Sequence, residues 1–387
     1  MAELNELLTD LLDRRMDRRS FVRRATALGL SASAIGVLLA ACGQSTTPST
    51  VSGSLVNKVP LKRQPNDKVV RIAFDLPSQA QLRWQFDQRF FQAGATELGD
   101  QVSFQNANDS ESLQLSQVEN FLSASPDVLV VVPINVQSAG SFATTASKQG
   151  VKVVAYNQII LNSAGVNYWV ARDNVAVGTK TATLALGAKP KGNYVICSGD
   201  AGTDVAQDKT KGYMQALQPA IARGDVKVVS QQFNRAWDPA LGLKQVEDAL
   251  TANSNKVAAV LCNYDGFALS AMQALKEQNL TGQAWIGGED VFPEGAQAIV
   301  EGRMTMSFYT DLEQMARLAV QAAHDLGNGR QPQSNDTFNN GAGTIPGYRV
   351  NSFPVTKDNM CQFIKQTGWV TYDKTFTNVA ASARPQC

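Results

Sequence analysis

The stretch Val69-Val70-Arg71-Ile72-Ala73-Phe74 is the first of a series of short, mostly apolar runs. Three further runs follow it: Val102-Ser103-Phe104, Val128-Leu129-Val130-Val131-Val132 and Val151-Lys152-Val153-Val154-Ala155. Continuous runs rich in β-branched residues are typical of strands that are buried on both faces of a parallel sheet. The stretches between them, such as 81–98 and 111–123, repeat apolar residues at helical spacing, which gives the order strand, helix, strand.

The same alternation restarts after Asn174. Each of the later predicted strands is followed by a helical segment, and these strands are Gly192–Cys197, Val226–Gln231, Val257–Cys262 and Ala284–Gly287. The sequence therefore predicts an α/β protein with two similar Rossmann-like lobes, each built on a parallel sheet.

Loops at the carboxyl ends of parallel strands form the natural ligand crevice of such a sheet. Here these loops are rich in amides, carboxylates and tryptophans, and they comprise 75–85, 133–135, 156–158, 198–204, 233–237, 263–266 and 289–290. They lack a glycine-rich phosphate loop, a cysteine pair at metal spacing and a Gly-x-Ser-x-Gly motif. We therefore expect no cofactor, no metal and no catalytic residue.

The composition is that of a globular chain without a dominant charge. Of 387 residues, 44% are hydrophobic and 18% charged, and 35 Lys plus Arg balance 34 Asp plus Glu to leave a net charge of +1. No global field then favours nucleic acid, acidic substrates or a membrane surface. A small neutral partner fits best.

The single histidine, His324, lies in a helical run at 312–326 and not in a cluster of metal ligands. This position disfavours a His-based zinc site and a Ser-His-Asp triad. A structural or solvent-facing role is expected instead.

The N-terminus has the order of an export signal. A twin-arginine pair, Arg18-Arg19, stands close to Phe21, and an uncharged apolar stretch follows from Ala25 to Ala41. The stretch is marginal for a bilayer span and is weakened by Gly and Ser, so a permanent transmembrane helix is the poorer interpretation. Residues 1–41 are predicted to be a twin-arginine signal peptide.

The signal ends in Leu39-Ala40-Ala41-Cys42, which resembles a lipobox. Cys42 would then carry the lipid and become the first residue of the mature protein. The Ser/Thr/Gly-rich segment that follows cannot form a core, so residues 42–66 are predicted to be a flexible tether. We expect an exported protein that lies at the outer face of the cytoplasmic membrane or in the periplasm. It would contact the membrane through its lipid anchor only.

Export permits disulfides. Cys361 and Cys387 both lie in the C-terminal tail and are possible partners. Cys197 and Cys262 lie in apolar strands and are expected to be buried free thiols.

A sugar offers adjacent hydroxyl groups and C–H faces, so its site needs planar polar groups and aromatic rings. The predicted strand ends supply such groups at Arg83, Trp84, Asn157, Gln158, Asp173, Trp237, Asp265 and Asp290. Each has a structural alternative, because an Asp at a strand end is often a helix N-cap and a Trp is often part of the core.

From Val69 to about Asn359 the chain resembles the ribose/galactose-type periplasmic binding proteins, especially their xylose-binding branch. The agreeing stretches are Arg83-Trp84-Gln85, 114–120, 127–133, 249–253, 326–329 and 339–341. The resemblance implies a type I binding protein whose lobes are joined by a three-strand hinge, with crossings near Asp173, near 289–304 and near the C-terminal segment. It implies an N-terminal lobe of 67–173 plus about 305–340, and a C-terminal lobe of 174–304 plus about 341–387.

Arg83, Trp84, Asp173, Trp237 and Asp290 match sugar-contacting positions of that family. Four positions depart from its xylose-binding pattern, because Asn157-Gln158 replaces an Asp-Arg pair, Tyr264 replaces an Asn before Asp265, and Thr310 replaces a Lys. Charge-assisted contacts are about twice as strong as neutral ones, so the preferred sugar could change. Xylose and glucose are both expected candidates.

The resemblance implies a monomeric sugar-binding component of an ABC importer, which delivers a monosaccharide to a membrane permease and its ATPase. A sugar-sensing lipoprotein that presents its ligand-bound form to a membrane receptor is the alternative. An exported glycosidase would need a pair of carboxylates, which Asp173, Asp265 and Asp290 could superficially supply. A repressor would need a helix-turn-helix where the export signal stands.

Overall fold

The computed structural model describes residues 55–56 and 59–387. The predicted signal peptide, Cys42 and most of the predicted tether lie outside the described residues.

The first sheet forms the centre of the N-terminal lobe. Its strand order is β11-β12-β5-β4-β3-β1-β2, and all neighbours pair in parallel except β11 and β12. The strands are β1 (Arg71–Leu76), β2 (Gln101–Asn106), β3 (Val128–Val131), β4 (Lys152–Tyr156), β5 (Tyr168–Arg172), β11 (Asp336–Asn339) and β12 (Thr344–Val350). The four predicted runs correspond to β1 to β4, whereas β5 was not predicted.

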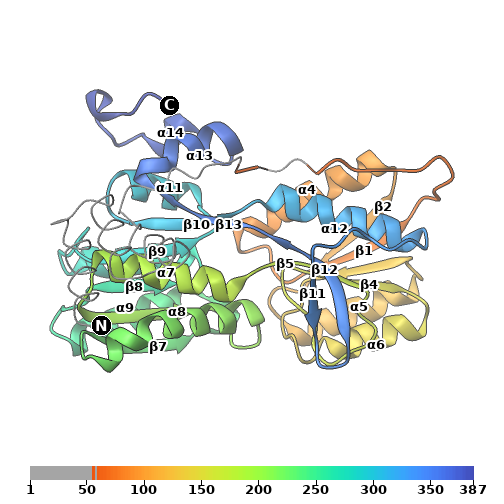
Figure 1. Cartoon of the computed structure of the whole chain (residues 1–387), viewed down its shortest axis with the longest axis horizontal. Helices are drawn as coiled ribbons and strands as arrows, with labels where there is room; N and C mark the ends of the chain where they lie inside the picture. Colours follow the sequence, from red (N-terminus) through yellow and green to blue (C-terminus); the bar gives the residue numbers. More distant parts are fainter. Residues whose placement is uncertain (1–54, 57–58) are drawn as a thin grey trace, which may run out of the picture. The chain divides into compact units, whose positions relative to one another are not determined.

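Helices cover both faces of this sheet, because alternate residues of its strands point to opposite sides. Helices α4 (Leu82–Leu98) and α12 (Leu312–Gly327) lie side by side and share one hydrophobic core with Phe74 and Val130 (Figure 1). On the other face, α5 (Glu111–Ser123) and α6 (Gly140–Lys148) pack on Leu129 and Val131.

The second sheet forms the centre of the C-terminal lobe. Its strand order is β13-β10-β9-β8-β6-β7, parallel throughout except for the β10–β13 pair. The strands are β6 (Gly192–Ser198), β7 (Val226–Phe233), β8 (Ala259–Cys262), β9 (Trp285–Glu289), β10 (Met306–Thr310) and β13 (Ser352–Thr356). The two mostly parallel sheets confirm the predicted α/β fold.

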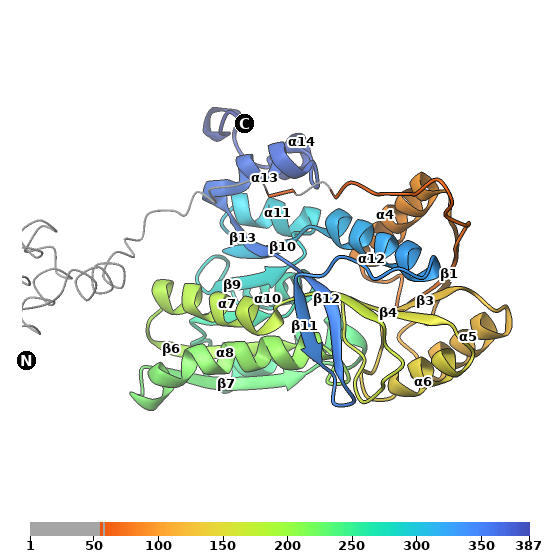
Figure 2. The ribbon, with the colours of Figure 1, turned by 45° about the vertical axis from the view of Figure 1, so that its right-hand side comes forward.

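Helices α7 (Asn174–Ala188) and α8 (Asp204–Ala222) run together along this lobe (Figure 2). They share a hydrophobic core with Tyr194, Ile196 and Leu261. The remaining helices are α9 (Pro239–Ala252), α10 (Asp265–Glu277), α11 (Pro293–Val300), α13 (Met360–Thr367) and α14 (Tyr372–Thr375), with short 3₁₀ turns at Arg235–Trp237, Lys357–Asn359 and Ala381–Ala383.

The chain passes between the two sheets at three places. It leaves β5 at Asp173 to enter α7, leaves β10 at Asp311 to enter α12, and leaves β12 at Asn351 to enter β13. The boundaries expected near 304 and 340 are therefore displaced: β10 pairs with β9 in the C-terminal sheet, and β12 pairs with β5 in the N-terminal sheet. The hinge crossing expected at 289–304 lies at Asp311 instead.

The last part of the predicted tether, residues 59–66, is bound along α12. The backbone of Lys62 exchanges two hydrogen bonds with the Gln321 side chain, at 2.7 and 3.1 Å, and Arg317 Nε donates to the Val59 carbonyl at 2.7 Å. Leu61 packs against the core of the N-terminal lobe. A free tether from 42 to 66 is therefore wrong for these residues.

His324 is fully buried and has a structural role. Its Nδ1 lies 2.7 Å from Asp100 Oδ2 and its Nε2 lies 2.8 Å from Asp67 Oδ2. These contacts tie α12 to the segment before β1 and to the loop before β2. A solvent-facing position is excluded.

The states of the four described cysteines are those expected from the sequence. Cys361 and Cys387 form a disulfide with their Cα atoms 4.9 Å apart, within the usual range for such bonds. Cys197 and Cys262 are buried free thiols.

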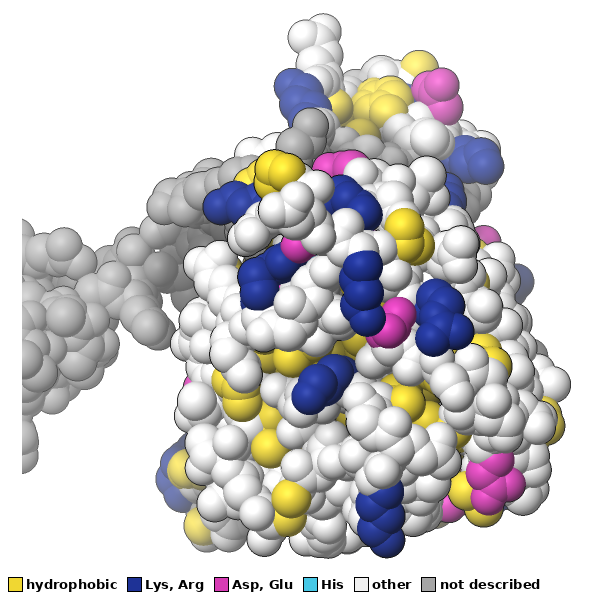
Figure 3. All heavy atoms as spheres, turned by 90° about the vertical axis from the view of Figure 1, so that its right-hand side faces the viewer, with side chains coloured by type: hydrophobic (Ala, Val, Ile, Leu, Met, Phe, Trp, Pro, Cys, Tyr) yellow, Lys and Arg dark blue, Asp and Glu magenta, His cyan; other side chains and the backbone are white. Residues whose placement is uncertain are grey.

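On the face of the molecule that Figure 3 shows, charged and hydrophobic side chains are dispersed among uncharged ones. The large hydrophobic side chains that are exposed, Val69, Leu113, Leu115, Phe233 and Leu241, are spread over several elements. Among the described helices none combines the length and the hydrophobicity of a membrane span, and no described group of His, Cys, Asp and Glu could hold a metal.

The buried carboxyl group of Asp75 in β1 should make the free energy of unfolding depend on pH. Its side chain is fully buried, and its Oδ1 accepts a hydrogen bond from Gln114 Nε2 at 3.0 Å. Burial raises the pKa of Asp75 to about 7, against about 3.9 in an unfolded chain. The raised pKa contributes stability that is complete below about pH 4 and is lost as the pH rises through about 7.

We therefore expect Asp75→Asn to match the wild type in free energy of unfolding at pH 4 and to exceed it by up to a few kcal/mol at pH 8. Urea unfolding at both pH values measures this difference. Asp248→Asn, on an exposed carboxylate, serves as the control and should leave the pH dependence unchanged. An unaltered pH dependence in Asp75→Asn would contradict the assignment.

Candidate functional site

A cavity with about 530 Å³ of empty space, including the open space at its mouth, lies where the carboxyl ends of the two sheets meet. The N-terminal lobe lines it with Pro77, Gln81, Arg83, Trp84, Asp109, Ile134, Asn157, Gln158 and Arg172, and the C-terminal lobe with Asp200, Thr203, Val205, Lys209, Ala236, Trp237, Asn263, Tyr264 and Asp290.

Most of the predicted site residues meet in this cavity. They come from loops far apart in the sequence and are Arg83, Trp84, Asn157, Gln158, Trp237, Tyr264 and Asp290. The cavity thus combines amides, charged groups and aromatic rings from both lobes.

Asp173 and Thr310 do not line the cavity. Asp173 caps α7 by accepting a hydrogen bond from the Ala176 amide at 2.9 Å, and its side chain is 48% exposed. Thr310 is buried in the β10–β13 pair, where its hydroxyl lies 2.6 Å from that of Ser352. The structure thus places Asp173 at a helix cap and Thr310 in a strand pair, and does not bring either to the other predicted site residues.

Asp265 is also outside the cavity lining. It is fully buried at the start of α10, where it accepts hydrogen bonds from the Phe292 amide and the Ser307 hydroxyl, both at 2.7 Å. Burial raises its pKa well above the usual range. Asp265 therefore fixes the turn after β9, next to Asp290, and both of its carboxylate oxygens are bonded within the protein.

Arg83 connects the two lobes. Its Nε lies 3.2 Å from Asp87 Oδ2 within α4, and its Nη1 lies 3.5 Å from Asp290 Oδ1 in the other lobe. Burial lowers the pKa of Arg83, but the carboxylates of Asp87 and Asp290 outweigh it and raise the pKa overall. Asp87 also accepts a short hydrogen bond from the Tyr156 hydroxyl.

A second buried charge network lies at the floor of the cavity. Glu289, the last residue of β9, pairs with Arg172 Nε of the N-terminal lobe at 2.5 Å and with Lys209 Nζ of the C-terminal lobe. All three side chains are only 2% exposed. Burial lowers the pKa of Lys209 well below its usual range and that of Arg172 to about 10.

Trp237 and Tyr264 form an aromatic wall. Their rings meet edge to face with centroids 5.7 Å apart, and the Tyr264 hydroxyl donates to the Trp237 carbonyl at 2.7 Å. This hydrogen bond holds Trp237 in the left-handed conformation, with φ of 55°. Trp84 supplies a ring on the other lobe, with the Arg83 guanidinium 4.5 Å from its centroid.

Four buried polar atoms of lining residues have no hydrogen-bond partner in the described part of the chain. One of them, Arg172 Nε, is ion-paired with Glu289, which leaves Arg83 Nη2, Trp84 Nε1 and Gln158 Oε1. An unpaired buried polar group costs about 1 to 3 kcal/mol, so such groups in a cavity indicate a polar ligand. Two donors and one acceptor suit hydroxyl groups, which both donate and accept.

Three lining residues were not predicted from the sequence, namely Arg172, Lys209 and Asp109. Arg172 ends β5, whose apolar run Tyr168-Trp169-Val170-Ala171 was a usable signal. Lys209 stands four residues from Val205 and from Tyr213, on the buried face of α8, so a lysine within an apolar helical stripe was the second signal. Asp109 lies in the loop after β2 and had no comparable signal.

The cavity and its two-sheet frame agree with comparisons to known proteins. Residues 72–331 match the model of the periplasmic binding protein domain. The D-xylose-binding periplasmic protein of Escherichia coli strain K12 is 35% identical over 302 residues, which cover 78% of this chain and 91% of that protein. The chain belongs to the periplasmic binding protein family.

Other relatives of this binding protein also carry sugar names. The multiple sugar-binding periplasmic receptor ChvE of Rhizobium radiobacter is 28% identical, with 78% of this chain and 91% of the receptor covered. Among solved structures, an ABC transporter solute binding protein from Clostridium phytofermentans with bound β-D-glucose superposes with a TM-score of 0.73 at 26% identity. It covers 79% of this chain and 99% of its own.

The buried pairing of Glu289 with Arg172 and Lys209 in this binding protein can be tested by mutation. Glu289→Gln leaves Arg172 and Lys209 buried without their shared carboxylate, which should lower the free energy of unfolding by about 3 to 5 kcal/mol. Urea unfolding at neutral pH measures the loss. Glu97→Gln, which breaks the half-exposed Arg317–Glu97 pair, is the matched control and should cost about 1 kcal/mol or less. Equal losses in the two variants would contradict the role of Glu289.

Proposed function

We propose that this binding protein is the extracytoplasmic sugar-binding component of an ABC-type importer. It captures a neutral monosaccharide, xylose or glucose, between its lobes and delivers it to a membrane permease. The observation that carries the proposal is the set of unpartnered polar atoms on Arg83, Trp84 and Gln158 in a cavity with aromatic rings on both lobes.

The charge balance of the cavity supports a neutral ligand. Arg83 is paired with Asp87 and Asp290, and Glu289 is shared between Arg172 and Lys209. The cations around the cavity thus already have carboxylate partners, so an anionic ligand would have to displace an existing ion pair. Sugar hydroxyls can instead satisfy the remaining donors and the acceptor without a change of charge.

The choice between xylose and glucose depends on the positions that depart from the xylose-binding pattern. Asn157, Gln158 and Tyr264 line the cavity, whereas Thr310 does not. Asn157 Oδ1 accepts from Arg172 Nη1 at 2.5 Å, and the Tyr264 hydroxyl is bonded to Trp237, so Gln158 is the departing residue with a free polar atom. The relatives named for xylose and crystallised with glucose keep both sugars as candidates.

Lobe closure is the expected mechanism. The Arg83–Asp290 and Arg172–Glu289 ion pairs and the Val136 N–H to Gly202 carbonyl bond, at 3.0 Å, all join the two lobes. A ligand that contacts both lobes binds the closed form better than the open form and shifts the equilibrium toward it. A permease can then recognise the closed form.

A glycosidase is less consistent with the site. Of the three carboxylates that could have supplied a catalytic pair, Asp173 and Asp265 lie outside the cavity lining, and Asp290 pairs with Arg83. We infer that the protein binds its sugar without cleaving a bond.

Trp84→Phe tests the proposal. The substitution keeps an aromatic ring and removes the Nε1 donor, so the sugar loses one hydrogen bond and the dissociation constant should rise about tenfold. A thermal-shift screen of pentoses, hexoses and disaccharides first identifies the sugar, because a ligand at 100 times its dissociation constant adds about 2.7 kcal/mol of stability. Isothermal titration then measures the dissociation constant of each variant.

Asp173→Asn is the matched control. It alters a conspicuous carboxylate at a strand end but keeps a good N-cap for α7, so affinity and stability should both be unchanged. A thermal-shift screen in which no monosaccharide raises the melting temperature would refute the sugar-binding proposal.

We also propose that Cys42 is lipidated and anchors the exported protein. Its place at the end of an apolar signal segment and before a Ser/Thr-rich stretch supports this. Cells expressing the full chain should incorporate labelled palmitate into it, and Cys42→Ser should abolish the label and release the protein from the membrane fraction. Membrane retention of an unlabelled Cys42→Ser protein would contradict the anchor.

A further inference from the structure

The turn that carries Asp290 has a strained backbone. Asp290 has φ of 89° and Val291 has φ of 49°, both in the left-handed region. A β-branched residue such as Val is a genuine outlier there. Such conformations persist only where the surroundings fix them, and they cluster at ligand sites.

Hydrogen bonds from the C-terminal lobe hold the amide side of this turn. The Asp290 amide donates to the Phe308 carbonyl at 2.8 Å, and the Val291 amide donates to the Ser307 hydroxyl at 3.0 Å. The next amide, that of Phe292, donates to Asp265. Consecutive amides of the turn are thereby satisfied.

The Val291 carbonyl of the same turn is held by a residue near the C-terminus. Trp369 Nε1 donates to the Val291 carbonyl at 2.9 Å. The same indole ring packs on Phe86 of α4, with ring centroids 4.3 Å apart, and on Tyr309 at 5.8 Å. Trp369 therefore contacts the turn of Asp290 and the helix that carries Arg83 and Trp84.

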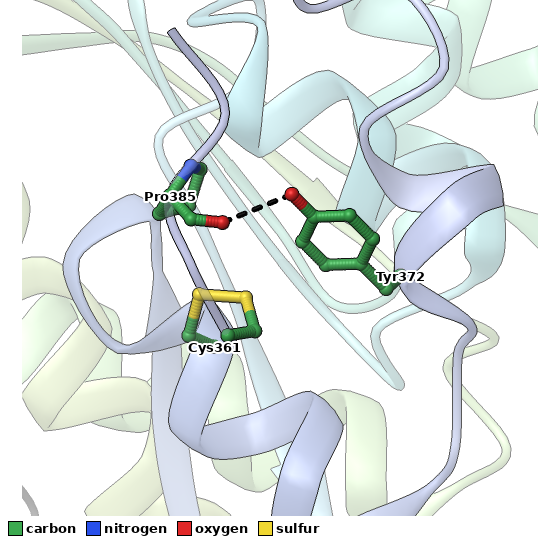
Figure 4. Close-up of a disulfide and its surroundings, with 4 residues drawn as sticks. Cys361, Tyr372 and Pro385 are labelled. Atoms are coloured by element: carbon green, nitrogen blue, oxygen red, sulfur yellow. Dashed lines mark hydrogen bonds between the residues drawn. A yellow bond between two sulfur atoms is a disulfide. The ribbon is translucent and has the colours of Figure 1, made fainter. Parts of the chain in front are cut away.

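Trp369 lies in a covalently closed segment. The Cys361–Cys387 disulfide joins α13 to the C-terminus, and the Tyr372 hydroxyl donates to the Pro385 carbonyl at 2.9 Å across the same loop (Figure 4). The indole stands between α13 and α14, inside this closed loop. The segment is thus constrained where it reaches the site.

We infer that Trp369 is a positioning residue for the sugar site: its hydrogen bond to Val291 holds the strained turn that aims Asp290 at Arg83. The inference rests on the proposed function, because Asp290 matters only if the cavity takes a ligand. Trp369 does not line the cavity, so it acts through Asp290 and not by touching the sugar.

A double-mutant cycle tests this inference. Trp369→Phe keeps a ring against Phe86 and removes the donor to Val291. It should weaken binding of the sugar identified by thermal shift about tenfold, the effect of one lost hydrogen bond. In an Asp290→Asn background the same substitution should cost nothing further, because its effect passes through the Asp290 carboxylate. Losses that multiply in the double variant would overturn the inference.

Hydrogen exchange supplies a readout that does not depend on sugar. In the ligand-free protein, Trp369→Phe should speed exchange of the amides of Asp290, Val291 and Phe292 several-fold. Tyr372→Phe is the matched control, because it removes a hydrogen bond within the same closed loop but leaves Val291 untouched. If exchange of these amides is unchanged in Trp369→Phe, the inference is wrong, whatever affinity the variant has for sugar.

The two proposals can fail separately. Faster exchange in a protein that binds no sugar would refute the proposed function and leave the hold on the turn intact. Normal sugar binding by the wild type and by Trp369→Phe would refute the positioning role alone. Replacing both Cys361 and Cys387 with Ser should also speed amide exchange in the turn of Asp290, but less than Trp369→Phe does. If exchange in that variant stays at the wild-type rate, the disulfide is not needed to hold Trp369 against the turn.

Discussion

The buried carboxylate of Glu289 is the interaction on which the rest of the site depends. A charge removed from water must be paired, and Glu289 finds its partners in Arg172 of one lobe and Lys209 of the other. Removing either lobe from this contact would leave charged groups unpaired at the cavity floor. The position of the lobes around the cavity is thereby linked to the pairing of these three side chains.

The same logic extends to the walls of the cavity. Arg83 is paired with Asp87 of its own helix and reaches Asp290 of the other lobe only at 3.5 Å, so this contact is the looser of the two interlobe ion pairs. A sugar hydroxyl near Arg83 and Asp290 can tighten the closed arrangement without changing its charge balance. The ion pairs hold the two lobes in position around the cavity. The polar atoms of Arg83, Trp84 and Gln158 that have no partner in the protein are then available to hydrogen-bond the ligand.

The sequence predicts those parts of the protein that local patterns determine. Continuous apolar runs identify β1 to β4, and helical periodicity identifies α5 with its observed bounds. Strand-end loops identify most of the cavity residues. The crossing at Asp311 escapes prediction because β10 pairs with both sheet neighbours through its backbone, which leaves no mark in its side chains. That Asp173, Asp265 and Thr310 lie outside the cavity lining escapes prediction because a cap, a buried acceptor and a ligand contact can require the same residue types.

The strained turn at Asp290 shows why parts of a binding site cannot be predicted from local sequence patterns. Its conformation is determined jointly by Asp265, Ser307, Phe308 and Trp369, which are separated by up to about a hundred residues and share no motif. None of them lines the cavity, yet each fixes one backbone group of the turn. A carboxylate already held in place loses little conformational freedom when a sugar binds, so part of the binding free energy is supplied during folding by residues outside the cavity. If Trp369 positions Asp290 as we infer, residues behind the cavity contribute to sugar affinity together with those that line it.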